Sequence, residues 1–226
     1  MALRKKVKAV LELSPDILIV PESEHPEKIN FQGVESNSVW IGENPNKGLA
    51  VYGFNGVSLE LDSLYTDQFR HIAPINVTFN DFEFSILAVW TMPCSKPREQ
   101  RYIGQVYYSI DHYKEFIDQH TLIVGDFNWN LVFDTGKKKA NFSSVVGRFS
   151  EMGIKSAYHQ QNDQAFGKES QNTFFMYRKE ERQYHIDYCF HGEYWKGRLN
   201  SVKIGQYKDW KEYSDHTPLV VRYEYS

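Results

Sequence analysis

An acid and an amide follow a short apolar run near the middle of the chain. The run at residues 122–124 ends at Gly125, and Asp126 and Asn128 come directly after it. Unbroken apolar residues indicate a strand buried on both faces, and the glycine marks its carboxyl end. A carboxylate beside a carboxamide supplies hard oxygen ligands and an N–H donor, which suit Mg²⁺ or Mn²⁺ and a phosphate. On its own, this pattern also fits an ordinary turn.

Two later stretches also place polar residues near the ends of strands. Polar and apolar residues alternate over 184–190, which predicts a strand with His185 and Asp187 on one face. Asp215 and His216 stand just before the last apolar run of the chain. Taken singly, Asp187 is explained by a hydrogen-bonded structural role and Asp215 by a turn. The recurrence at three separate places favours metal, phosphate and proton chemistry.

These motifs, in this order, resemble the endonuclease/exonuclease/phosphatase superfamily, which includes deoxyribonuclease I and exonuclease III. The resemblance is carried by Gly125-Asp126-Phe127-Asn128, His185-Ile186-Asp187-Tyr188 and Ser214-Asp215-His216. Residues 15–22 also resemble the early strand of the family, which ends in a metal-binding Glu. The resemblance covers residues 15–221, and the ordered set is more specific than any one of its motifs.

The resemblance implies a metal-dependent phosphoesterase and gives the acidic residues their roles. Glu22 would hold Mg²⁺ or Mn²⁺, and Asp215 would complete the metal or water network. Asp126 would position or deprotonate the attacking water, and Asn128 would hydrogen-bond the phosphate. Glu24, two residues beyond Glu22, is expected to be an exposed loop acid.

Proton chemistry and substrate contacts are implied at further positions. Asp187 would orient His216 and favour its imidazolium form beside the phosphoryl oxygens. His185 is either a second phosphate contact or a structural histidine with satisfied polar atoms. The chain departs from the family before Met92, because Trp90 stands where the family often has a His or Tyr that contacts the phosphate. A tryptophan there could pack on a base or sugar.

The elements that must position these residues indicate an α+β protein. Apolar runs predict strands at 16–21, 49–54, 57–61, 71–79 and 82–90. Short turns between neighbouring strands make them antiparallel. Helical periodicity predicts helices at 3–13, 98–119 and 142–152. Together with the resemblance, this predicts a two-sheet sandwich with outer helices, the deoxyribonuclease I-like four-layer α/β/β/α fold, as a single domain over 1–226.

Composition limits the classes of function. The formal net charge is −3 and the pI is near 6.2, so the protein does not coat nucleic acid through bulk positive charge. Cys94 and Cys189 lack any metal-binding spacing, which favours the reducing cytoplasm over a disulfide-bonded secreted domain. No apolar run approaches the ~20 residues of a membrane span, and the first residues lack the apolar core of a signal peptide. We therefore expect no membrane partner.

One element of the family is missing from the expected fold. Members of the family usually begin with a core strand ending Trp-Asn, which leads into a helix like that at 3–13. Here the helix begins almost at Met1, so we expect the first strand to be absent and Met1 to be an internal methionine of a longer reading frame. Loss of an interior strand would leave two unpaired sheet edges and an apolar slot.

The activity that the sequence favours is hydrolysis of phosphodiester bonds in nucleic acid. No motif that reads bases is present, so the alternative substrate is a small or lipid phosphoester. A catalytically weak binding module is a third interpretation, favoured by Trp90 and by the missing strand.

Overall fold

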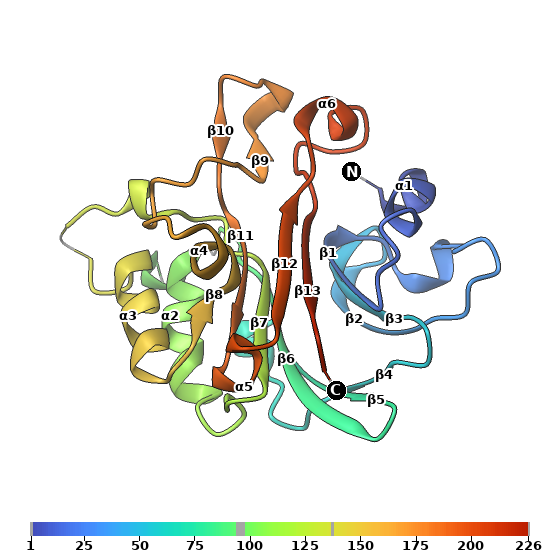
Figure 1. Cartoon of the computed structure of the whole chain (residues 1–226), viewed down its shortest axis with the longest axis horizontal. Coiled ribbons are helices and arrows are strands. Elements are labelled where there is room, and N and C mark those ends of the chain that lie inside the picture. The colour runs from blue at the N-terminus through green and yellow to red at the C-terminus, as the bar shows by residue number, and fades with distance from the viewer. Residues whose placement is uncertain (1, 94–97, 137, 226) are drawn as a thin grey trace.

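Four layers follow one another across the molecule (Figure 1). The structure is a computed structural model that describes residues 2–93, 98–136 and 138–225, so Cys94 lies outside the described residues. Helices α2 (Ile103–His112) and α3 (Phe142–Glu151) cover one sheet, and a second group of strands lies between that sheet and α1 (Val7–Leu11). The predicted α/β/β/α arrangement is therefore confirmed.

The larger sheet contains the strand that ends at Asp126. Its strand order is β4 (Ser58–Leu61), β5 (Ile72–Phe79), β6 (Phe82–Trp90), β7 (Thr121–Asp126), β11 (Asp187–His191) and β8 (Lys155–Ser156). Neighbouring strands pair antiparallel except β6 and β7, which are parallel because α2 forms the crossover between them. The carboxyl ends of β6 and β7 therefore meet at one edge, where Trp90 lies opposite Asp126.

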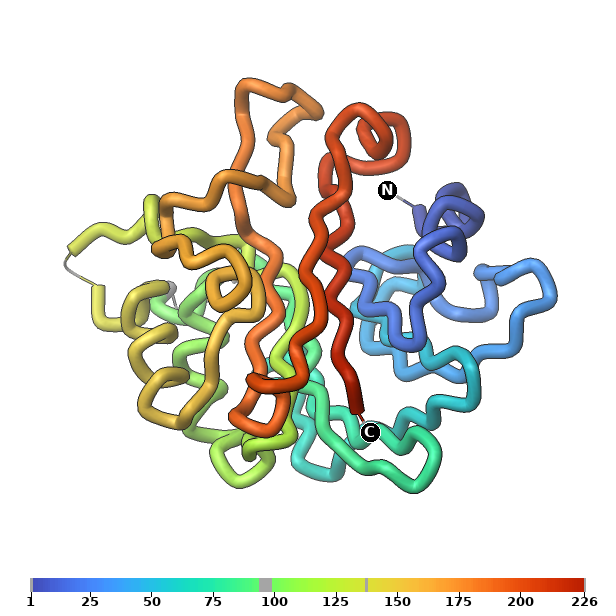
Figure 2. Tube along the Cα trace, in the orientation of Figure 1, coloured from blue at the N-terminus to red at the C-terminus, as the bar shows by residue number. Residues whose placement is uncertain are grey.

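The second group of strands forms two small sheets. β1 (Ile17–Ser23), β3 (Lys47–Gly53) and β2 (Asn37–Asn44) form one sheet in that order, and β12 (Leu199–Ile204) pairs with β13 (Leu219–Tyr223) in the other. Among the described residues, β1 pairs only with β3 and β13 only with β12, so each has one unpaired edge. Both strands line one cavity of about 620 Å³, and no described strand runs between them (Figure 2).

Apolar cores between and outside the sheets hold the layers together. Ile110 of α2 and Phe149 of α3 pack on the outer face of the larger sheet. Ile86 and Leu49 belong to the core between the facing strands, and Val7 of α1 belongs to the core on the far side. Because these cores are apolar, Asp126 and Asp187 lie at the ends of their strands and not in the middle of the sheet.

Most strands match their expected ranges, but the helix predicted over 98–119 is confined to α2, after a 3₁₀ turn at Arg98–Gln100, and β12 was not predicted. The strand predicted over 184–190 is broken, because β10 (Gln183–Tyr184) ends before His185 and β11 begins at Asp187. Because His185 lies outside both strands, the alternation of side chains along a strand does not apply to it, and His185 and Asp187 do not share one strand face as predicted. The periodicity also missed β2, whose apolar residues are few and lie in a polar stretch.

Short elements complete the chain. They are β9 (Phe174–Phe175), α4 (Ala157–Asn162), α5 (Glu193–Lys196), α6 (Tyr207–Trp210) and 3₁₀ turns at Leu3–Lys5, Pro26–Lys28, Asp67–Phe69, Arg98–Gln100, Leu131–Phe133 and Met176–Arg178. None of the described helices has the length and apolar character that crossing a membrane requires.

Candidate active site

The carboxylate of Asp126 is buried at the end of β7. Asp126 is 4% exposed and lies between Trp90 of β6 and Asp187 of β11 in the sheet register. Asn128 donates its backbone N–H to Oδ1 of Asp126 and a side-chain N–H to Oδ2, and each hydrogen bond is 2.8 Å long. The same amide nitrogen donates to the Thr91 carbonyl oxygen at 2.9 Å. Both amide hydrogens of Asn128 are thus engaged, and in this structure Asn128 holds Asp126 and has no free N–H for a phosphate.

Backbone geometry explains why a glycine precedes Asp126. Gly125 has a φ of +144°, and a Cβ built on it would lie 1.9 Å from the Val89 carbonyl oxygen. A glycine is needed where φ is positive and another backbone approaches this closely. Thr91 closes the turn, because its Oγ1 donates to the Phe127 carbonyl oxygen at 2.6 Å. The motif is therefore a fixed turn that orients the carboxylate.

Asp187 and His216 form a hydrogen-bonded pair beside Asp126. Oδ2 of Asp187 lies 2.8 Å from Nδ1 of His216, and a backbone bridge to Phe174 fixes the loop that carries the imidazole. Burial by itself lowers the pKa of His216, but the charge and hydrogen bond of Asp187 outweigh it, and the pKa rises to about 9. His216 is therefore an imidazolium at neutral pH, and Asp187 sets its orientation.

The environment of Asp126 favours its neutral form, whereas that of His216 favours its charged form. Burial and the nearby charge of Asp187 raise the pKa of Asp126 to about 8, although the charge of His216 acts in the other direction. A carboxylate is suited to accept a proton when its pKa lies close to the working pH. The site thus combines a candidate base with a neighbouring cation.

The oxygen donors around Asp126 fit a hard divalent cation. One ligand atom from each of Asp126, Asp187 and His216 lies within 4.8 Å of the others. A protonated His216 is a poor ligand, because metal ligands must be deprotonated. Glu22 and Asp215 line the same cavity and offer further carboxylate oxygens. With a pKa of about 8 in the metal-free protein, Asp126 is largely protonated at neutral pH, and a bound cation would favour its carboxylate form.

Glu22 stands on the same cavity but outside the group of three. Its Oε1 is 2.7 Å from Lys47 Nζ, and both side chains are close to half exposed. The backbone of Glu22 has a φ of +58°, a conformation that is unfavourable for a residue with a Cβ and that recurs at functional sites. Glu22 is therefore held at the mouth of the cavity by a lysine.

Trp90 does not offer its ring to a substrate. The residue is 3% exposed, and its ring centroid lies 4.6 Å from that of His71. Lys47 Nζ lies 5.4 Å from the centroid of the same ring. The expected contact with a base or sugar is therefore not supported, because the ring belongs to the core and packs beneath the lysine that pairs with Glu22.

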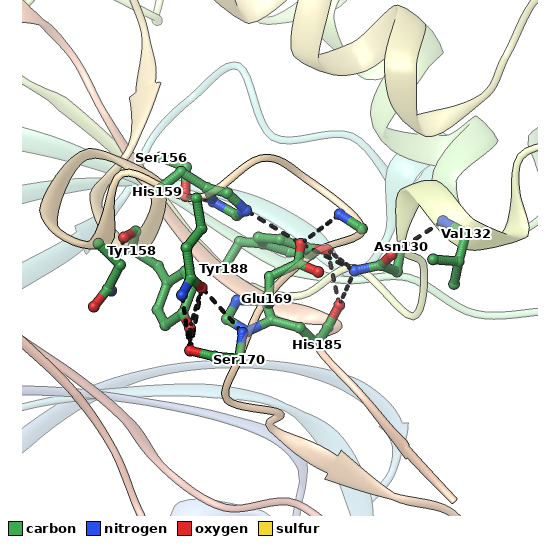
Figure 3. A network of polar contacts seen from close by, with 12 residues as sticks. Asn130, Val132, Ser156, Tyr158, His159, Glu169, Ser170, His185 and Tyr188 are labelled. Atoms are coloured by element: carbon green, nitrogen blue, oxygen red, sulfur yellow. Dashed lines mark hydrogen bonds and ion pairs between the residues drawn. The ribbon is translucent and has the colours of Figure 1, made fainter.

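His185 is also buried, and it is not among the residues that line the cavity. It is 1% exposed, and its Nδ1 lies 2.9 Å from the Gln171 carbonyl oxygen. Its own carbonyl oxygen accepts hydrogen bonds from Asn130 and Tyr188, at 2.8 Å each, within the polar network of Figure 3. This burial favours a structural position for His185 over a phosphate contact, but its polar atoms are not all satisfied, because the buried Nε2 has no hydrogen-bond partner among the described residues.

Sequence reasoning missed two residues near the site. Glu24 was expected to be exposed but is 2% exposed, and its carboxylate accepts the Leu3 N–H at 2.7 Å and pairs with the Arg4 guanidinium. Lys6 lines the cavity that contains Asp126. Nothing in the sequence separates Lys6 from the other lysines of this segment, since only packing decides which one faces the cavity.

Comparison with protein-family models and with curated protein sequences finds no match. Solved structures do match. A 3′ phosphatase, NExo from Neisseria, bound to product DNA hairpin, is 18% identical with a TM-score of 0.68, over 99% of this chain and 96% of that one. An AP endonuclease from Archaeoglobus fulgidus is 19% identical with a TM-score of 0.68, over 97% and 93%. The AP endonuclease LMAP from Leishmania major is 12% identical with a TM-score of 0.72, over 98% and 82%. The resemblance drawn from the motifs is therefore confirmed at the level of the fold.

Proposed function

We propose that this protein is a divalent-metal-dependent phosphoesterase that cleaves phosphodiester bonds in nucleic acid. The observation that carries the proposal is the meeting of the buried carboxylate of Asp126 with the His216 imidazolium at one cavity. Phosphoester hydrolysis needs a base for the attacking water and positive charge near the phosphoryl oxygens. The similar folds of a phosphatase bound to a DNA hairpin and of two AP endonucleases support nucleic acid as the substrate.

Each residue has a role that follows from its contacts. Asp126 accepts the proton of the attacking water, and Asn128 keeps both carboxylate oxygens in place. Asp187 engages Nδ1 of His216, which leaves Nε2–H to donate to a phosphoryl oxygen. Mg²⁺ or Mn²⁺, held by Glu22 and Asp215, would supply the charge that polarises the phosphoryl group.

Three substrates separate the candidate activities. Purified protein is assayed with bis-p-nitrophenyl phosphate, p-nitrophenyl phosphate and plasmid DNA, with Mg²⁺ or with EDTA. We expect hydrolysis of the diester and nicking of the plasmid, both abolished by EDTA. Turnover of the monoester alone would favour a phosphatase of small or lipid esters, and DNA binding without turnover would favour a binding module.

A matched variant shows whether the described site does the chemistry. His216→Gln keeps a side chain of similar size and removes the imidazolium, so we expect a loss of about 10²–10⁴ in rate. His112→Gln is the control, because His112 is exposed on α2 on the outer face of the larger sheet. Equal activity of the two variants would rule out the assigned site.

A cytoplasmic location is part of the same proposal. Cys189 is a free thiol and is buried, and burial raises its pKa to about 12. A reduced cysteine of this kind is ordinary in the cytoplasm, where disulfides are rare. Measuring where a fluorescent fusion of the protein accumulates in its own cells tests this location.

A further inference from the structure

The N-terminal segment of the chain is fixed against the end of β1. Leu3 is fully buried and Val7 is 4% exposed, so the segment is anchored on both sides of the residues between them. The buried carboxylate of Glu24 accepts the Leu3 N–H at 2.7 Å and pairs with the Arg4 guanidinium. Because these contacts tie the segment to β1, the side chain at position 6 has a defined direction.

Lys6 is half-buried and lines the cavity that contains Asp126, Asp187 and His216. Within the described part of the chain, its ammonium forms no ion pair within 4.0 Å, whereas Lys47 pairs directly with Glu22. Burial lowers the pKa of Lys6, and the charge of Asp215 is the largest of the influences that raise it. Lys6 is thus a partly desolvated cation that faces acids without a bonded partner.

The charges of the cavity explain why such a cation is useful. Glu22, Asp187 and Asp215 all line it, so a phosphate approaching the site meets several carboxylates. Like charges repel strongly where solvent is partly excluded. A half-buried ammonium that is not neutralised by a neighbour is available to an anionic ligand, and lysine binds phosphate as a compact point charge.

We propose that Lys6 is a substrate-binding residue that donates from its ammonium group to a phosphoryl oxygen in this cavity. The inference rests on the proposed function for the identity of the substrate, and on the packing of the N-terminal segment for the position of the lysine. It assigns a direct part in binding phosphate to the residue that joins the 3₁₀ turn Leu3–Lys5 to α1.

The test compares three lysines of one short segment. Lys6→Gln removes the charge from the cavity, whereas Lys5→Gln and Lys8→Gln remove it from exposed positions. Binding of inorganic phosphate is measured by calorimetry with saturating Mg²⁺, and KM and kcat are measured with bis-p-nitrophenyl phosphate. For Lys6→Gln we expect phosphate to bind roughly 10- to 100-fold more weakly, as for loss of one hydrogen bond to a charged group. The other two variants should bind phosphate as the wild type does.

A charge-conserving variant and the hydrolysis assay separate the binding role of Lys6 from a structural role. Lys6→Arg keeps the charge and should retain most of the phosphate affinity, which a purely structural role for the lysine stem would not require. Unchanged affinity in Lys6→Gln, or equal losses in all three Gln variants, would overturn the proposal. Failure of the wild type to hydrolyse any ester, together with phosphate binding that depends on Lys6, would refute the proposed function and leave the binding role standing.

Discussion

Asp126→Asn should make the metal-free protein more stable and at the same time remove its hydrolytic activity. Asp126 is 4% exposed, and burial together with the charge of Asp187 raises its pKa from 3.8 to about 8. The folded protein therefore favours the neutral, protonated form of this carboxyl group. Its stabilising contribution is complete below pH 3.8 and is lost as the pH rises through about 8. Asparagine has nearly the same shape and carries no charge to bury.

The magnitude follows from this shift and from one hydrogen bond. At about 1.4 kcal/mol per pKa unit, the difference between 3.8 and about 8 sets an upper bound of roughly 6 kcal/mol at pH 8. The substituted amide would turn an N–H toward the Asn128 side chain, where Asp126 now accepts a bond of 2.8 Å, at a cost of about 1–2 kcal/mol. Relaxation and coupling to Asp187 reduce the gain further, so we expect a net stabilisation of about 1–3 kcal/mol at pH 8.

Urea unfolding in EDTA, from pH 4 to pH 9, measures this effect. The advantage of Asp126→Asn should be near zero at pH 4 and should grow up to about pH 8, which corresponds to a rise in Tm of roughly 2–12 °C. Added Mg²⁺ should stabilise the wild type, by about 2.7 kcal/mol at a hundred times its Kd, and should stabilise the variant less. Diester hydrolysis by the variant should fall about 10²–10⁴-fold.

Two outcomes would contradict the roles assigned to Asp126. If Asp126→Asn is no more stable than the wild type in EDTA at pH 8, then Asp126 is not a carboxylate held against a desolvation penalty. If its turnover is undiminished, Asp126 is not the base. Asp163→Asn is the control, because Asp163 lies outside the cavity on the turn after α4.

Three other predictions concern the Asp187–His216 pair and the backbone of the turn at Gly125. Because the pKa of His216 is raised from 6.5 to about 9, the stability it contributes is complete below pH 6.5 and is lost as the pH rises through about 9, and His216→Gln should abolish this pH dependence of unfolding. The double variant Asp187→Ala/His216→Ala should hydrolyse the diester scarcely more slowly than either single variant, and fully multiplicative losses would show that the two residues act separately. Gly125→Ala should cost about 3 kcal/mol or more of unfolding free energy, because its Cβ would meet the Val89 carbonyl oxygen at 1.9 Å and its φ is +144°. Gly147→Ala, on an open face of α3, should instead be neutral or stabilising by up to about 1 kcal/mol, and a similar loss in both variants would contradict the argument.

Local pattern was enough to identify the strands and the residues at their ends. Apolar runs predicted β3, β5 and β6 closely, because a strand in this interior needs apolar side chains on both faces. Gly125, Asp126 and Asn128 could also be selected as one unit, since a turn that holds a carboxylate is built from neighbouring residues. The order of the motifs along the chain then indicated the fold, which the solved structures confirm.

Burial and side-chain direction at the site required the tertiary structure. His185 and Trp90 could be expected to face the substrate, but each is enclosed by residues distant in sequence. The pairing of Asp187 with His216 also joins separate parts of the chain, and its geometry depends on a backbone bridge that no spacing reveals. These features arise from contacts between distant segments, which a local pattern does not contain.

The lysines near the N-terminus illustrate the same division. The pattern of residues predicts a short amphipathic segment with solvated positions that carries Lys5, Lys6 and Lys8. Only the packing of Leu3 and the buried carboxylate of Glu24 decided that Lys6 faces the cavity while its neighbours face solvent. Lys6 lies between the 3₁₀ turn Leu3–Lys5 and α1, so its direction is set by what these two short elements pack against and not by the residue types they carry.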